Sequence, residues 1–278
     1  MHAYNNIHAI TIIVVAFYLT LKINIYKDMK NIITRLMAIY ALIAINSQAQ
    51  ILIGLGEYLE TFDSMGTSSS AQIPTNWKIS PAGDSTPQWD DQNNFTAVNR
   101  AASSGSPTAG GRYNWGDGTS DRALGFMTSS SYSSPNSIMV WLQNSSEFKL
   151  NHLTVSYDIE RYRINSSAAS VTFAYSYDGQ NWTQYSDATI TFDSGTSTYF
   201  FPPQVQSKNF TLNNLDLAQN GDFYLCWTFD TVGANSQGLG LDNVRLSAVP
   251  EPREWLFSIS LGLIGFAAAR RFLLKHNA

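Results

Sequence analysis

The sequence has a single cysteine, Cys226, among its 278 residues. One thiol cannot form a disulfide within the chain, so a disulfide-stapled scaffold is excluded. Cys226 lies in the apolar run "FYLCWTF" with no histidine beside it, which favours a buried core thiol over a nucleophile. Of the four histidines only His152 lies in the central part of the chain, where "LNHLTVSY" is typical of the start of a strand. A Ser-His-Asp triad is therefore not indicated.

Charge is also scarce, at 14% of residues, and its distribution is uneven. Between residues 51 and 249 there are 18 Asp and Glu against 9 Lys and Arg, a balance of −9. Phosphate recognition needs clustered basic side chains, so this acidic middle excludes nucleic acid as the expected partner. The remaining basic residues flank apolar segments at the two ends, where cations mark the cytoplasmic side of a membrane.

Two apolar segments precede residue 51, and the second has the parts of a secretory signal. Lys30 and Arg35 form a basic region, residues 36–45 are apolar, and "SQA" ends at Ala49 with small residues. The first segment, residues 7–21, lacks both the basic start and a cleavage site. We therefore expect translation to begin at Met29 and signal peptidase to cleave after Ala49, so that 1–49 is an extension plus a signal helix. The alternative is a genuine N-terminal membrane helix.

The central residues 50–248 read as many short strands. "SVTFAYSYDGQNWTQY" (170–185) alternates apolar and polar side chains, then turns at "DGQ" and returns, which predicts a hairpin. Residues 137–144 and 153–164 show comparable strand patterns, and no long helical period separates them. This pattern predicts an all-β fold, a two-sheet antiparallel β-sandwich of the jelly-roll kind. Residues 67–118 are poor in strand signal and are expected to form long loops.

Five aromatic residues lie in loop-like sequence. Their rings either stack on the apolar faces of sugars or plug the ends of the sandwich, and the sequence leaves both interpretations open. As the candidate ligand-binding residues we take Trp77, Trp89, Tyr113, Trp115 and Tyr132.

Two pairs of acidic residues could serve hydrolysis or metal binding. Asp158 and Glu160 share one face of one strand, and two facing acids are what a glycoside hydrolase needs. Neighbouring arginines make a solvated strand face the simpler interpretation, so an exported glycan-acting hydrolase is the alternative function. Asp117 and Asp121 lie in "NWGDGTSDRALGF", where they either bind calcium or cap a tight loop, and the loop is favoured.

The C-terminal 30 residues, 249–278, form a separate segment. It contains Val249, Pro250, Glu251 and Pro252, then Trp255, an apolar stretch to Ala269, and finally Arg270 and Arg271. This order resembles the PEP-CTERM sorting signal of Gram-negative bacteria. The resemblance implies that exosortase, a membrane enzyme, cleaves near the Pro-Glu-Pro triplet and passes the protein to the cell surface or extracellular matrix.

The length of the apolar stretch agrees with that resemblance. Residues 255–269 span about 22 Å as a helix, against a hydrocarbon core of about 30 Å. Such a transmembrane helix suits a temporary anchor in the inner membrane, with the two arginines on the inside and the sandwich outside.

The central domain opens with "EYLETFDSMG" and closes with "GLGLDNVRLS". These two segments resemble those of lectin-like and carbohydrate-binding jelly rolls. A jelly roll pairs its first and last strands, so we expect Glu60 or Asp63 to approach Asp242. Carboxylates so close together repel one another unless a cation separates them, and we expect a structural calcium ion, with Arg245 or a strand-end amide as the alternative partner. The function indicated is a non-catalytic, structural or adhesive surface protein that binds exopolysaccharide.

Overall fold

The computed structural model describes residues 50–54, 56–100, 107–234 and 236–248. The expected signal peptide, its cleavage site at Ala49 and the C-terminal sorting segment lie outside these residues. Within the described part, no helix is long and apolar enough to span a membrane.

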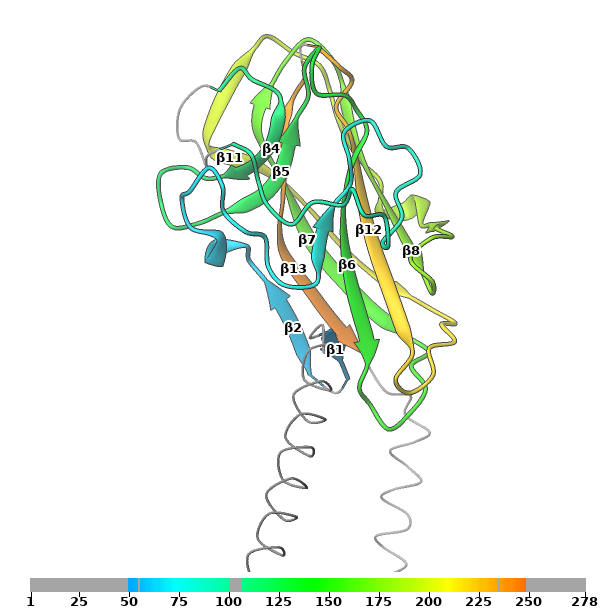
Figure 1. Cartoon of the computed structure of the whole chain (residues 1–278). Coiled ribbons are helices and arrows are strands. Elements are labelled where there is room, and N and C mark those ends of the chain that lie inside the picture. The colour runs from blue at the N-terminus through cyan, green and yellow to red at the C-terminus, as the bar shows by residue number, and fades with distance from the viewer. Residues whose placement is uncertain (1–49, 55, 101–106, 235, 249–278) are drawn as a thin grey trace, which may run out of the picture. The chain divides into compact units, whose positions relative to one another are not determined.

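The described residues fold into two β-sheets, which Figure 1 shows as two layers. The seven-stranded sheet contains β1 (Ile51–Ile53), β3 (Trp77–Ile79), β6 (Asn136–Asn144), β8 (Ala169–Ser176), β9 (Thr183–Gln184), β10 (Ile190–Phe192) and β12 (Asp222–Asp230). The six-stranded sheet contains β2 (Glu57–Glu60), β4 (Gly111–Trp115), β5 (Ala123–Met127), β7 (Leu153–Ile164), β11 (Thr198–Leu212) and β13 (Gly238–Ala248). The helical elements of the described part are two 3-10 turns, η1 (Asp63–Met65) and η2 (Ser186–Ala188). The predicted all-β sandwich is confirmed.

Most strands pair in antiparallel fashion, as predicted, with one exception. β1 runs parallel to β6, with Ile51 opposite Leu142. A parallel pair needs a long connection, and the chain between β1 and β6 supplies it.

The hydrophobic core lies between the two sheets, where alternate residues of each strand face inward. On β8 the side chains of Val171 and Phe173 are fully buried, and Phe173 contacts Trp227 at 5.4 Å between ring centroids. The hairpin predicted after β8 is present, because Tyr175 pairs with Thr183 on β9. The faces assigned to this strand from its period-2 pattern are therefore confirmed.

The opening segment at Glu57–Glu60 pairs with the last strand, as predicted. β2 lies antiparallel to β13, with Glu60 opposite Val244 and Tyr58 opposite Leu246. β13 also pairs with β7 and with β5, so it lies inside the six-stranded sheet. This arrangement places the closing "LDNV" residues beside the opening strand.

The expectation that residues 67–118 form only loops is wrong. The segment contains β3, which adds to β6, and β4, which forms an edge of the six-stranded sheet beside β5. β3 is only three residues long, too short to show a recognisable alternation in the sequence.

Candidate functional site

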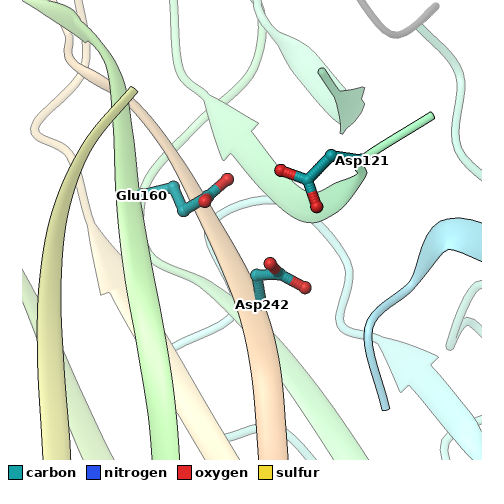
Figure 2. A group of neighbouring side chains, drawn as sticks. All are labelled: Asp121, Glu160 and Asp242. Atoms are coloured by element: carbon teal, nitrogen blue, oxygen red, sulfur yellow. The ribbon is translucent and has the colours of Figure 1, made fainter. Parts of the chain in front are cut away.

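Three carboxylates meet on the outer face of the six-stranded sheet. Figure 2 shows Glu160 on β7, Asp242 on the neighbouring β13, and Asp121 on the segment that leads into β5. Their oxygens lie within 4.8 Å of one another, which is close enough to share one cation. Glu160 and Asp242 are buried, with 5% and 0% of their surface exposed, and Asp121 is the most exposed of the three.

A β-bulge in β13 shapes this part of the sheet. Asp242 lies opposite Asp158 and Arg245 opposite Ser156, so β13 contains one extra residue between these pairs. Asn243 adopts a left-handed backbone conformation there, with φ of 50°, which asparagine tolerates better than most residues. Its side-chain amide donates hydrogen bonds to Asp242, at 2.9 Å, and to Asp158, at 3.0 Å.

Asp121 is positioned by the buried arginine that follows it. The backbone N–H of Arg122 donates to Asp63, at 3.0 Å, and its side chain donates to the carbonyl oxygens of Gly66 and Asp121, at 2.9 and 2.7 Å. These bonds dock η1 and the turn after it against the segment that carries Asp121.

The residues predicted to hold calcium are only partly brought together. Asp242 is in the cluster. Asp63 lies near enough that its charge adds to burial in raising the pKa of Asp121 and of Asp242. Glu60 is not a member, because its carboxylate accepts hydrogen bonds from Phe62 N–H, at 2.8 Å, and from the Tyr58 hydroxyl, at 3.1 Å. Asp121 and Glu160 take its place. The pairing of β2 with β13 was predicted correctly, but the set of carboxylates that form the cluster was not.

Burial dominates the electrostatics of the cluster. Burial first, and the neighbouring carboxylates after it, raise the pKa of Asp242 to about 8 and that of Glu160 to about 7. Glu160 accepts a hydrogen bond from the Tyr162 hydroxyl, which favours its charged form. The Oδ1 atom of Asp242 is buried and has no hydrogen-bond partner within the described structure.

This arrangement has two chemically reasonable states. Either the buried carboxyls retain protons at neutral pH, or a hard cation compensates their charge. A cation would also supply the missing partner of the Asp242 oxygen. The acidic triad could therefore hold a metal ion.

Of the two interpretations left open for the five loop aromatics, burial is the one that the structure shows for four. Trp77, Trp89, Tyr113 and Trp115 are all buried, with at most 3% of their surface exposed. Tyr132 is half-buried, and its hydroxyl oxygen is buried. Trp77 belongs to β3 rather than to a loop, and it stacks in the core on Trp227, at 5.8 Å between ring centroids.

Tyr113 and Trp115 form a buried stack beside the acidic cluster. The ring centroids of Tyr113 and Trp115 are 4.2 Å apart, and those of Trp115 and Tyr162 are 5.1 Å apart. The Trp115 indole crosses β13, where its N–H donates to the Leu239 carbonyl at 3.0 Å. A β-carbon added to Gly238 would lie 2.9 Å from the Trp115 ring, so the indole uses the space that glycine leaves. The stack is structural.

A second aromatic cluster lies on the outer face of the seven-stranded sheet, and we call it the aromatic patch. It consists of Trp89, Trp141, Trp182 and Tyr224, packed around Met139 and Cys226. Trp89 comes from the loop after β3 and is buried, whereas Trp141 on β6 and Trp182 after β8 are half-buried and reach solvent. Trp141 and Tyr224 pair across β6 and β12, with parallel rings at 6.1 Å.

Sequence reasoning missed Trp141 and Trp182 as candidate binding residues. The signal was available for Trp141, because it occupies an outward position in the predicted strand at 137–144. No alternation marked Trp182, whose indole N–H donates to the Pro87 carbonyl at 2.6 Å. Strand pairing and the loop after β3 together bring the two tryptophans to one patch, because β12 separates β6 from β8 and Trp182 is hydrogen-bonded to that loop.

The other sequence candidates have ordinary structural surroundings. Asp117 caps its loop by accepting hydrogen bonds from the N–H and hydroxyl of Thr119, at 3.0 and 2.6 Å, so the loop interpretation holds for Asp117. His152 lies 3.0 Å from the side-chain oxygen of Asn213. Cys226 is buried as predicted, and burial raises its thiol pKa to about 11.

Comparison with known proteins gives structural likenesses only. No protein-family model matches the chain, and no curated protein matches it in sequence. Among solved structures, TmCBM61 in complex with β-1,4-galactotriose matches at 12% identity and TM-score 0.33, over 68% of this chain and 94% of that one. A cleaved adhesin domain of Lys-gingipain from Porphyromonas gingivalis matches at 12% identity and TM-score 0.39, over 69% and 98%. The xylan-binding CBM22-1 domain of Paenibacillus barcinonensis Xyn10C matches at 11% identity and TM-score 0.34, over 67% and 94%.

Proposed function

We propose that this chain is an exported, non-catalytic surface or matrix protein that binds polysaccharide through the aromatic patch. The observation that carries the proposal is the pair of half-buried tryptophans, Trp141 and Trp182, beside Trp89 and Tyr224 on one sheet face. Indole faces are large, rigid and electron-rich, so they attract the C–H groups of a sugar ring without requiring any side chain to move. Gln143 on the same face offers its side-chain amide to sugar hydroxyls.

The placement of the acidic residues favours binding over hydrolysis. Glycoside cleavage needs two carboxyls that flank a bond of the bound sugar. Glu160 and Asp242 are buried on the opposite sheet from the aromatic patch, and Asp158 is engaged by Ser207 and Asn243. A polymer chain lying on the patch would be out of reach of these acids.

Calcium is the ion that the acidic triad would suit. Calcium prefers several carboxylate and carbonyl oxygens, and the triad supplies carboxylates on three separate segments of chain. We propose that Asp121, Glu160 and Asp242 would hold it, in place of the set containing Glu60. The ion would stabilise the fold by linking β7, β13 and the segment before β5.

Export and sorting complete the proposal and rest on the sequence. Signal peptidase would remove the N-terminal segment after Ala49, and the C-terminal helix would hold the protein in the inner membrane. Exosortase would then act near Pro250, Glu251 and Pro252 and release the domain to the cell surface or extracellular matrix of a Gram-negative bacterium.

A glycan array tests binding and turnover together. The purified full chain in detergent should bind polysaccharide without releasing products, and Trp141→Ala should weaken that binding. Leu59→Ala, a surface substitution on the other sheet, is the matched control, since Leu59 is exposed and lies away from the patch. Release of soluble sugars would support the hydrolase alternative, whereas the absence of glycan binding would contradict the proposal.

A further inference from the structure

The aromatic patch is surrounded by negative charge. Asp222 on β12 accepts a hydrogen bond from the Trp141 indole N–H at 3.0 Å. Asp90 and Asp178 are exposed and lie on loops beside the patch. All three carboxylates act on the Tyr224 hydroxyl, whose pKa is raised to about 12, first by burial and then by Asp222, Asp90 and Asp178.

Lys78 is the cation that the described residues place on this patch. Its ammonium group lies 4.2 Å from the centroid of the Trp89 ring and donates a hydrogen bond to the Trp89 carbonyl at 2.7 Å. One ammonium against three carboxylates leaves a surplus of negative charge around the patch. The contact also shows that an indole of this cluster already accommodates an ammonium group on its face.

Asp178 is held in its charged form. Its carboxylate accepts hydrogen bonds from the backbone N–H groups of Gln180 and Asn181, at 2.9 and 2.8 Å, and these bonds lower its pKa. Gly179, the next residue, packs against Trp89 and Tyr224, so the charge is fixed close to the rings. The charge of Asp178 is therefore held in place by the backbone of its own loop.

Resting on the proposed polysaccharide binding, we propose that the ligand is a polysaccharide that carries unacetylated amino sugars. The ring faces of Trp141 and Trp182 stack on the sugar, and its protonated amine is attracted both to the indoles and to the carboxylates around them. A polyuronate would be repelled by the same carboxylates and by the −9 balance of the central domain. The charge of the patch thus determines which class of polysaccharide binds, while the rings supply affinity for sugar.

The test compares four polymers of matched length against the purified full chain in detergent. They are β-1,4-linked glucosamine, the same polymer N-acetylated, a neutral β-glucan and a polyuronate, each measured by calorimetry at low and moderate salt. The amino polymer should bind most tightly, by about tenfold over the acetylated one, which corresponds to a few ionic contacts of modest strength. Its advantage should shrink as salt rises, because salt screens exposed charges.

Two variants separate specific from diffuse attraction. Asp222→Asn should weaken binding of the amino polymer about threefold and leave binding of the neutral glucan unchanged. Trp141→Ala should weaken binding of both, because the ring contacts the sugar itself. Glu57→Gln is the matched control for loss of one negative charge, since Glu57 is exposed and pairs with Arg245 on the other sheet.

The outcomes distinguish the amino-sugar inference from the polysaccharide binding on which it rests. Equal binding of amino and acetylated polymers, with no effect of Asp222→Asn, would overturn the amino-sugar inference and leave polysaccharide binding intact. Amino-polymer binding that survives Trp141→Ala would show a diffuse charge effect and would also overturn the inference. Failure to bind any of the four, or tight binding of the polyuronate, would remove the amino-sugar assignment, and the glycan array would then decide whether another polysaccharide binds.

Discussion

Removing calcium should lower the melting temperature of this protein much more near neutral pH than in mild acid. The reason lies in the buried carboxyls of Glu160 and Asp242, whose pKa values are raised to about 7 and about 8. A raised pKa means that the folded state binds protons more tightly than the unfolded state. Without a cation, the contribution of these two carboxyls to stability is therefore highest at low pH and falls as pH rises from about 4 towards 8.

The size of the effect follows from the number of protons that the folded cluster retains. Each retained proton changes the unfolding free energy by about 1.4 kcal/mol per pH unit. From about pH 5.5 to about pH 7.5, one proton corresponds to about 3 kcal/mol. A domain of this size shifts its melting temperature by about 2–4 °C per kcal/mol, so the metal-free protein should melt about 6–12 °C lower at the higher pH.

Calcium should offset this loss, because an ion that binds only the folded state stabilises it by mass action. The assay is a thermal melt of the full chain with calcium and with excess chelator, at both pH values, together with metal analysis of the purified protein. Calcium should raise the melting temperature at the higher pH and have little effect at the lower pH, where protons compete for the same oxygens.

Asp242→Asn provides the sharpest variant, because it keeps the shape of the side chain and removes its charge. The variant should lose the calcium response and should also lose part of the pH dependence of the metal-free protein. Glu57→Gln should keep both, since its partner pair with Arg245 is exposed. An identical melting temperature with calcium and with chelator, and no metal in the protein, would remove calcium from the account. A metal-free stability that does not fall with pH would refute the raised pKa values.

Three further predictions concern the core, sorting and processing. Phe173→Ala should destabilise the sandwich by about 3–5 kcal/mol in urea unfolding, because the ring is fully buried against Trp227; a loss below about 1 kcal/mol would contradict that burial. Replacing Pro250, Glu251 and Pro252 together by alanine should leave the protein in the membrane fraction at full length, and normal surface delivery would exclude the sorting interpretation. Sequencing of the secreted protein should find Gln50 as its first residue, whereas retention of residues 1–28 would show that translation begins at Met1.

Much of the fold could be predicted from the sequence because it depends on local patterns. The alternation through Val171, Phe173 and Tyr175 identified a strand and its inward face, and the turn after it identified the hairpin. The pairing of β2 with β13 also followed from the jelly-roll interpretation, although the first described strand, β1, pairs with β6 instead. β3 was missed because three residues cannot establish a period.

The candidate sites were harder to predict because they lie on the outer faces of the sheets. Alternation shows which side chains point away from the core, but not which of these a loop then covers. The sequence therefore left open whether Trp89 and Trp115 are exposed. Both are buried, Trp89 on the loop after β3 against Tyr224 and Trp115 across β13. Trp141 also occupies an outward position on its strand, and it remains half-buried.

The sequence by itself determined that this chain forms a β-sandwich with an acidic surface, because the alternation of apolar and polar side chains and the charge are properties of each segment alone. Only the tertiary structure decided where the acids meet. Asp121, Glu160 and Asp242 come from three distant segments, and the bulge at Asn243 shapes the strand beside them. Register and bulges arise from pairing between strands. The position of the site therefore depends on which strands pair, and the pattern of a single strand does not contain that information.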